Sequence, residues 1–132
     1  MKHVTLQIRT GAHTELNDIT SQVAKAVSES GVRDGRCTVY IPHTTCGVTI
    51  NENADPSVKR DILKELNKVI PLDDNYAHME GNSAAHIKSS LMGFSVTIPV
   101  SGGSMMLGTW QGIYLCEFDG PRSRKAVVSV GD

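Results

Sequence analysis

Hydrophobic and polar residues alternate over several short segments of the chain, which is the pattern of half-buried β-strands. Val4, Leu6 and Ile8 show it first, each separated from the next by one polar residue. The strands expected on this basis span residues 3–10, 14–17, 37–41, 48–51, 94–100, 105–110, 113–118 and 125–130.

The connections between these segments suggest how the strands pair. Gly11 permits a turn, so the segment 14–17 is expected to return along the first strand. The segment 48–51 is expected to be the partner of 37–41. Pro99 has no N–H to donate, which predicts that the strand 94–100 is at a sheet edge or is bulged there.

The first helix is marked by apolar residues at four-residue spacing. Ile19, Val23 and Val27 form this stripe. Asp18 is expected to cap the N-terminus, because its carboxylate can accept hydrogen bonds from free backbone N–H groups of the first turn. Gly31 is expected to end the helix, since glycine adopts the left-handed conformation found at helix C-termini.

Two further helices are predicted in the middle of the chain. Asp55 and Pro56 form a strong helix start, and Pro71 is expected to stop the helix. A polar loop at 72–82 then leads to a short helix over 83–92. The apolar stripe of the longer helix consists of Val58, Ile62, Leu66 and Val69.

The order of these elements predicts one α+β domain over residues 1–132, with three helices and a mixed or largely antiparallel sheet. A length of 132 residues suits one domain, and 39% hydrophobic residues can build its core. The net charge of −1, without a basic block, argues against nucleic-acid binding. Arg122, Arg124 and Lys125 form a small basic cluster, of a size that suits one anionic ligand.

Cysteine usage and hydropathy indicate where the protein acts. Three cysteines without a CxxC pair argue against a disulfide framework and for a reducing compartment. The N-terminal segment lacks the apolar stretch of a signal peptide, and no run approaches the roughly 18 apolar residues of a membrane span. A cytoplasmic protein without membrane contact is therefore expected.

The segment IPHTTCGVTINEN, residues 41–53, carries an unusual number of chemically active groups for a connection between strands. Backbone N–H groups around Thr44, Thr45 and Gly47 could hold an anion, with the two hydroxyls as further donors. Glu52 suits a general base or a partner that orients a histidine. The alternative for Glu52 is a turn and capping cluster before the helix at Pro56.

Three of the five histidines lie where a strand end, a loop or a helix can direct them into one cavity. His43, His78 and His86 could together bind a metal, because neutral imidazole is a common metal ligand. The alternative is that His43 and His86 are hydrogen-bonded structural residues and His78 is solvated. His3 and His13 are expected at the surface.

Other polar residues suggest anion binding. Asn82 precedes the helix over 83–92, whose N-terminal N–H groups attract anions. Within that helix His86 and Ser89 are three apart and face the same side. Arg122 belongs to a charged turn that is either solvated or an arginine clamp for phosphate, which suits the planar guanidinium.

Three segments of the chain resemble the YjbQ-like family, also described as secondary thiamine-phosphate synthase. They are HTTCGVTINENADP at 43–56, YAHMEGNSAAHIKSSLMG at 76–93 and LGTWQGIYLCEFDGPRSRK at 107–125. The resemblance implies a small α+β homotrimer with ligand sites near the subunit boundaries. It implies a divalent-metal (zinc or magnesium) or anion site at His43, His78 and His86. The matched positions expected to line this site are Glu52, Asn82, Ser89, Gln111 and Arg122.

The activity implied by the resemblance is coupling of hydroxymethylpyrimidine diphosphate to thiazole phosphate with release of pyrophosphate. Metal and arginine would neutralise the departing diphosphate, and His43, His86 and Glu52 are the expected catalytic residues. One alternative is a non-catalytic trimeric module that binds a metal or a small anion. Another is a metal-dependent hydrolase of a small phosphorylated metabolite, with Glu52 as the base.

Overall fold

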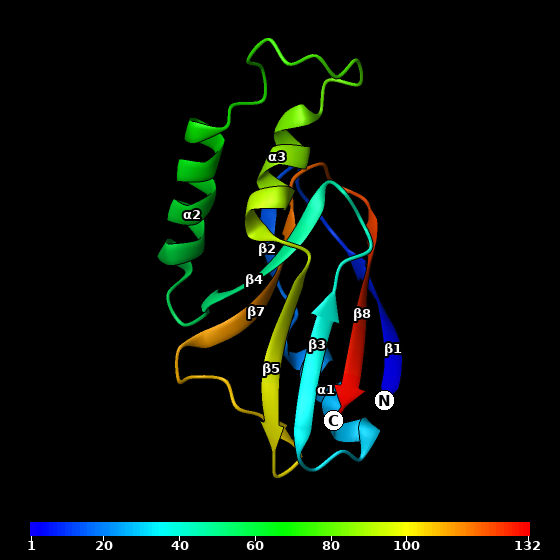
Figure 1. Ribbon diagram of the computed structural model, residues 1–132. Helices are drawn as coiled ribbons and strands as arrows, with labels where there is room; N and C mark the ends of the chain where they lie inside the picture. Colours follow the sequence, from blue (N-terminus) through cyan, green and yellow to red (C-terminus); the bar gives the residue numbers. More distant parts are fainter.

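Two antiparallel β-sheets and three helices make up the computed structural model, which describes residues 1–132 (Figure 1). The larger sheet has five strands in the order β1-β8-β3-β5-β6, and the smaller sheet has the order β2-β7-β4. The strands are β1 (Lys2–Arg9), β2 (Glu15–Asp18), β3 (Gly35–Tyr40), β4 (Cys46–Glu52), β5 (Ser95–Ser101), β6 (Ser104–Met105), β7 (Gln111–Glu117) and β8 (Ser123–Gly131). The helices are α1 (Thr20–Ser30), α2 (Pro56–Val69) and α3 (Ser83–Met92).

The main hydrophobic core lies between the two sheets. Val39 and Val128 enter it from the larger sheet, and Val48 and Leu115 enter it from the smaller one. The stripe predicted for the first helix also packs here, because Ile19, Val23 and Val27 all belong to this core. Alternation along the strands therefore sends one set of side chains inward, as the sequence pattern predicts.

Helices α2 and α3 cover the other face of the smaller sheet (Figure 1). Tyr114, Cys116 and Phe118 point to this side from β7 and its end, and Ala85 packs against them from α3. Ile62, Leu63 and Leu66 of α2 are partly buried here, whereas Val69 of the predicted stripe is 67% exposed. The ammonium group of Lys88 joins the two helices by donating to Asn67 Oδ1 at 2.6 Å. No helix of the chain is long and apolar enough to cross a membrane.

Two predicted strand pairings are wrong. Strand β2 does not return along β1; it pairs with β7, and β1 pairs with β8 over its whole length. Strand β4 is not the partner of β3, because β3 lies between β5 and β8 whereas β4 pairs with β7. Both edges of β3 are therefore already hydrogen-bonded. Residues 41–45, here called the crossover segment, carry the chain from one sheet to the other.

The C-terminal third differs from the prediction at one strand. Only Ser104–Met105 is extended, and the remainder of the predicted 105–110 strand is a loop. A tight turn ends it, in which Gly108 N–H donates to Gln111 Oε1 at 2.8 Å. Pro99 fits its strand because β6 pairs with β5 only at Val100 and Ser101, which leaves most of that flank of β5 open.

The helix ends follow from local side-chain chemistry. Asp55 accepts a hydrogen bond from Ser57 N–H at 2.9 Å, and Pro56 occupies the first turn, as predicted for α2. Gly31 ends α1 with a φ of 75°, also as predicted. The prediction that Asp18 is the N-cap of α1 is wrong, because Ile19 occupies that position; Asp18 still accepts a hydrogen bond from the backbone N–H of Thr20, the first helical residue, at 2.9 Å. The α+β class with three helices is confirmed, and every strand pair is antiparallel.

Candidate functional site

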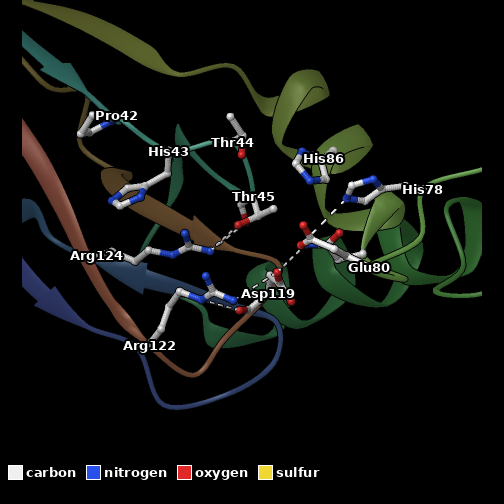
Figure 2. Close-up of a pocket in the computed structure, with 11 residues that line it drawn as sticks. Pro42, His43, Thr44, Thr45, His78, Glu80, His86, Asp119, Arg122 and Arg124 are labelled. Carbon is white, nitrogen blue, oxygen red and sulfur yellow. Dashed lines mark hydrogen bonds and ion pairs between the residues drawn. The ribbon is translucent and has the colours of Figure 1, made fainter.

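A polar cavity of about 500 Å³ lies where the crossover segment, the start of α3 and the β7–β8 connection meet (Figure 2). These three segments are far apart in the sequence and come from the three motifs that resemble a known family. None of the lining residues is hydrophobic. The lining consists of Pro42, His43, Thr44, Thr45, His78, Glu80, Asn82, His86, Asp119, Arg122 and Arg124.

A buried ion pair forms the inner wall of the cavity. Arg124 Nε donates to Glu117 Oε1 at 2.9 Å, and Arg124 Nη2 donates to Glu117 Oε2. The Arg124 side chain is 2% exposed and that of Glu117 is fully buried. Because the two planar groups meet through two parallel hydrogen bonds, the guanidinium is held in one orientation at the cavity.

Further hydrogen bonds keep the Glu117 carboxylate charged. Burial raises its pKa, but hydrogen bonds from Arg124, from Asp119 N–H and from the Thr10 hydroxyl outweigh burial, so the pKa lies below its ordinary value. Thr10 Oγ1 donates at 2.8 Å and Asp119 N–H at 3.0 Å. Burial likewise opposes the charge of Arg124, yet Glu117 beside it raises the Arg124 pKa. The pair is therefore ionised on both sides.

Thr45 is joined to the same guanidinium. Arg124 Nη2 donates to Thr45 Oγ1 at 2.8 Å and to its carbonyl oxygen at 3.2 Å. Because the Thr45 hydroxyl oxygen accepts from a cation, its own hydrogen is directed elsewhere and is polarised. Thr45 is buried and lines the cavity, whereas Thr44 lines it as an exposed residue. Both threonines thus lie at the predicted site.

His43 is held by the strand that carries Arg124. The backbone N–H of Lys125 donates to His43 Nε2 at 2.9 Å. Burial lowers the pKa of His43, and the positive charge of Arg124 adds to this effect. The ring is therefore neutral with its hydrogen on Nδ1, because Nε2 accepts a hydrogen bond. In this form His43 can donate through Nδ1 to a bound anion.

His78 and His86 lie together at the α3 side of the cavity, across from His43 (Figure 2). Their rings meet edge to face, with centroids 5.4 Å apart. Helix α3 carries His86 in its first turns, and the preceding loop carries His78. His78 Nε2 lies 4.0 Å from Glu80 Oε2.

The predicted three-histidine metal site is not formed within the chain. No group of three or more His, Cys, Asp or Glu side chains is placed so that it could hold a metal ion. The Nε2 lone pair of His43 accepts the Lys125 N–H and is not free to coordinate. His43, His78 and His86 do line one cavity, as predicted, but as separate polar groups. The residues present do not fit a three-histidine metal centre.

A chain of hydrogen bonds holds Arg122 at the cavity mouth. Arg122 Nε donates to the Asp119 carbonyl oxygen at 2.9 Å, and Nη2 donates to Asp119 Oδ2 at 3.2 Å. Asn82 Nδ2 donates to the same carboxylate oxygen at 2.9 Å. Asn82 and Arg122 thus both line the cavity, and their hydrogen bonds to Asp119 hold the turn in place.

Three predicted site residues lie outside this cavity. Glu52 is at the far end of β4 from Thr45, and its carboxylate accepts from Asp55 N–H at 3.2 Å, which matches the capping alternative. Gln111 holds the turn at Gly108. Ser89 is fully buried in α3, and its hydroxyl has no hydrogen-bond partner. In this chain none of the three faces the histidines across the cavity.

Glu80 and Asp119 line the cavity without having been predicted as site residues, and Arg124 was named only as part of the small basic cluster. A usable signal existed for Arg124. It lies on the inward-facing side of β8, the same side as the buried residues Ala126, Val128 and Val130. A charge at such a position needs a buried partner. Proline and glycine at 120–121 suggested a turn and drew attention to exposure instead.

The chain is a small α+β protein with a polar cavity where the connection between two antiparallel sheets meets the start of α3. Residues 4–132 match the family described as UPF0047 protein YjbQ-like, and the chain belongs to this family. UPF0047 protein MJ1081 of Methanocaldococcus jannaschii is 56% identical over 94% of this chain and 90% of its own length. UPF0047 protein YugU of Bacillus subtilis is 50% identical over 96% of each chain.

Solved structures of similar proteins have the same fold. An uncharacterised protein of the YjbQ/UPF0047 family from Clostridium acetobutylicum superposes with a TM-score of 0.95 and 55% identity, covering 97% of this chain and 99% of that one. A YbjQ-like protein of unknown function from Sulfolobus solfataricus gives a TM-score of 0.94 at 31% identity, covering 98% and 95%. These relatives establish family and fold.

Proposed function

We propose that the cavity binds the phosphate groups of a small phosphorylated metabolite and that the protein is a transferase. The reaction proposed is the coupling of hydroxymethylpyrimidine diphosphate to thiazole phosphate with release of pyrophosphate. The observation that carries the proposal is the pair of arginines, Arg122 and Arg124, each fixed by a carboxylate around a cavity without hydrophobic side chains.

Fixed arginines support this proposal because phosphate needs donors that are already in place. A planar guanidinium matches phosphate geometry and remains charged at any working pH. The Glu117 pair holds Arg124, and the backbone and side chain of Asp119 hold Arg122. Little rearrangement is then required when negative charge develops on a leaving group, which is the condition for electrostatic catalysis.

The proposed reaction assigns each of these groups a task. The bond between the pyrimidine methylene carbon and the diphosphate oxygen breaks, and a bond from that carbon to the thiazole nitrogen forms. The electron pair leaves with pyrophosphate, whose added negative charge is met by Arg122, Arg124 and the Thr45 hydroxyl. His43 donates through Nδ1, and His86 supplies a proton to the leaving group.

A zinc or magnesium ion is the cofactor that the family resemblance implies. Because the three histidines do not fit a metal centre in this chain, charge neutralisation in the proposal rests on the arginines. Elemental analysis of the purified protein tests the cofactor prediction. A stoichiometric metal that is lost in His43→Ala would show that His43 exchanges its Lys125 contact for coordination.

A time course of thiamine phosphate formation from the two phosphorylated precursors tests the activity. Wild type should form product, whereas His86→Ala and Arg122→Gln should lose most of it while remaining folded. Arg60→Gln, on the exposed side of α2, is the matched control and should retain full activity. Equal product from wild type and His86→Ala would contradict the assignment of the site.

A second candidate is a non-catalytic module that binds phosphate. It is favoured by the lining of the cavity, which has no hydrophobic wall for two heterocyclic rings. This candidate predicts retention of pyrophosphate with no product from either precursor. The hydrolase alternative receives less support, because Glu52 caps the turn before α2 and does not reach the cavity in this chain.

Assembly as a cytoplasmic homotrimer belongs to the same proposal. Trp110 is 63% exposed and Met106 is 61% exposed, and apolar side chains of this size are typical of surfaces that subunits cover. The three free cysteines are all buried, which suits a reducing compartment. Light scattering on the purified protein tests the trimer, and a monomeric mass would contradict it.

A further inference from the structure

The cavity offers hydrogen-bond acceptors as well as cationic donors. Asn82 Oδ1 is buried and has no hydrogen-bond partner in the chain, although Asn82 lines the cavity. A buried polar atom without a partner is costly, and such an atom in a native structure is satisfied by ordered water or by a bound ligand. An anion that carries no hydrogen cannot satisfy Asn82 Oδ1, because both the anion and this oxygen are hydrogen-bond acceptors.

The orientation of the Asn82 amide is fixed by its neighbour. Its Nδ2 donates to Asp119 Oδ2 at 2.9 Å. Rotating the amide by half a turn would place Oδ1 against the carboxylate, where two acceptors repel each other. The unpartnered atom is therefore the oxygen and not the nitrogen.

Asp119 adds a second acceptor beside it. Its Oδ2 receives hydrogen bonds from Asn82 Nδ2 and from Arg122 Nη2 at 3.2 Å. Its Oδ1 receives none from the chain. Asp119 lines the same cavity and is only partly exposed. Two free acceptors thus lie next to a guanidinium, and a ligand that fits must carry both negative oxygens and a hydrogen to donate.

We infer that the cavity selects a phosphate group that carries a hydroxyl hydrogen. The P–OH group donates to Asn82 Oδ1 or Asp119 Oδ1, while the unprotonated oxygens accept from Arg122, Arg124 and the Thr45 hydroxyl. This inference rests on the proposed phosphate binding and specifies its ligand. A fully deprotonated tetrahedral anion places an oxygen against Asp119 and binds more weakly.

Inorganic phosphate and sulfate are matched probes for this selection. Both are tetrahedral, and at pH about 8 both carry a charge of about −2, but only phosphate retains a hydrogen. Isothermal titration of each ion into wild-type protein at equal ionic strength should show phosphate binding at least about tenfold tighter, the effect of one hydrogen bond to a charged acceptor.

Asp119→Asn removes the carboxylate and provides an amide that can donate to sulfate. In this variant sulfate should bind more tightly and the preference for phosphate should fall by about tenfold. Asp61→Asn, on the exposed side of α2, removes the same charge away from the cavity and should keep the wild-type preference. The wild-type comparison stands even if Asp119→Asn does not fold.

The outcomes separate this inference from the function it rests on. Equal affinity of wild type for phosphate and sulfate would overturn the selection and leave phosphate binding intact. Binding of neither ion would overturn both. Unchanged preference in folded Asp119→Asn would remove Asp119 from the selection, contrary to the inference.

Discussion

Arg124 on β8 and Glu117 on β7 form a bidentate ion pair, and with it the larger sheet is joined to the smaller one at the inner wall of the cavity. Both side chains are buried, and Thr45 from the crossover segment completes the arrangement. The ion pair therefore has two roles: it places a cation at the cavity, and it links the two sheets.

Glu117→Gln should destabilise the protein strongly. Removing one partner of a buried ion pair leaves the other charge uncompensated, which costs about 3 kcal/mol or more. Urea unfolding followed by circular dichroism measures the loss. Glu65→Gln is the control, because Glu65 is exposed on α2 and its nearest cation, Lys68 Nζ, is 3.9 Å away. Equal free energies of unfolding for the two variants would show that the buried ion pair stabilises the protein no more than the exposed one.

The ion pair should also make the free energy of unfolding depend on pH in the acid range. The pKa of Glu117 in the folded protein lies below the ordinary carboxyl value of 4.5. A carboxylate whose pKa is depressed by folding contributes stability above the unfolded-state value and loses it as the pH falls through the folded-state value. The free energy of unfolding of wild type should therefore decrease as the pH falls below 4.5. Glu117→Gln should show a smaller decrease, and an identical pH profile would contradict the assignment.

His43 should titrate below its ordinary pKa and should carry its hydrogen on Nδ1. Burial and the Arg124 charge lower the pKa of His43 from 6.5. The neutral ring therefore contributes to the stability of the folded protein above pH 6.5, and this stability is lost as the pH falls through the folded-state pKa. Nitrogen-15 NMR of the histidine rings measures both features, with His43→Asn used to assign the signal. A neutral ring with hydrogen on Nε2 would contradict the hydrogen bond from Lys125.

Gly47→Ala should disturb the contact between β4 and α3. A methyl group at Gly47 would lie 2.8 Å from the Gly93 carbonyl oxygen and 3.1 Å from Met92 Cβ. Overpacking of this kind costs about 1–3 kcal/mol. Thermal unfolding compares it with Gly11→Ala, where the nearest atom is the flexible Glu15 Oε1 at 3.7 Å. A Gly47→Ala protein as stable as Gly11→Ala would show that α3 shifts freely.

Local patterns predicted most of the elements, because alternation, capping residues and glycine act over a few neighbouring residues. Asp55, Pro56 and Gly31 bound their helices as expected. Strand pairing was harder to predict, since it depends on contacts between distant segments. Residues 14–17 and 48–51 both turned out to pair with β7, more than sixty positions away.

The cavity was predictable only in part for the same reason. The three motifs identified His43, His78, His86, Asn82 and the two threonines as neighbours, and the structure brings them together. The hydrogen bond from Lys125 N–H to His43, which excludes the three-histidine centre, involves a backbone group and leaves no trace in the sequence. Glu52 belongs to the same sequence motif as His43, but the extended strand β4 separates the two residues in space.

The most direct test of the phosphate site is histidine NMR of the wild-type protein during a titration with pyrophosphate. All five histidines report in one experiment, and His3 and His13 serve as internal controls because they do not line the cavity. The account predicts that the ring signals of His43, His78 and His86 shift together with one affinity, and that His3 and His13 do not move. Binding that leaves the three cavity histidines unchanged, or no binding at all, would contradict it.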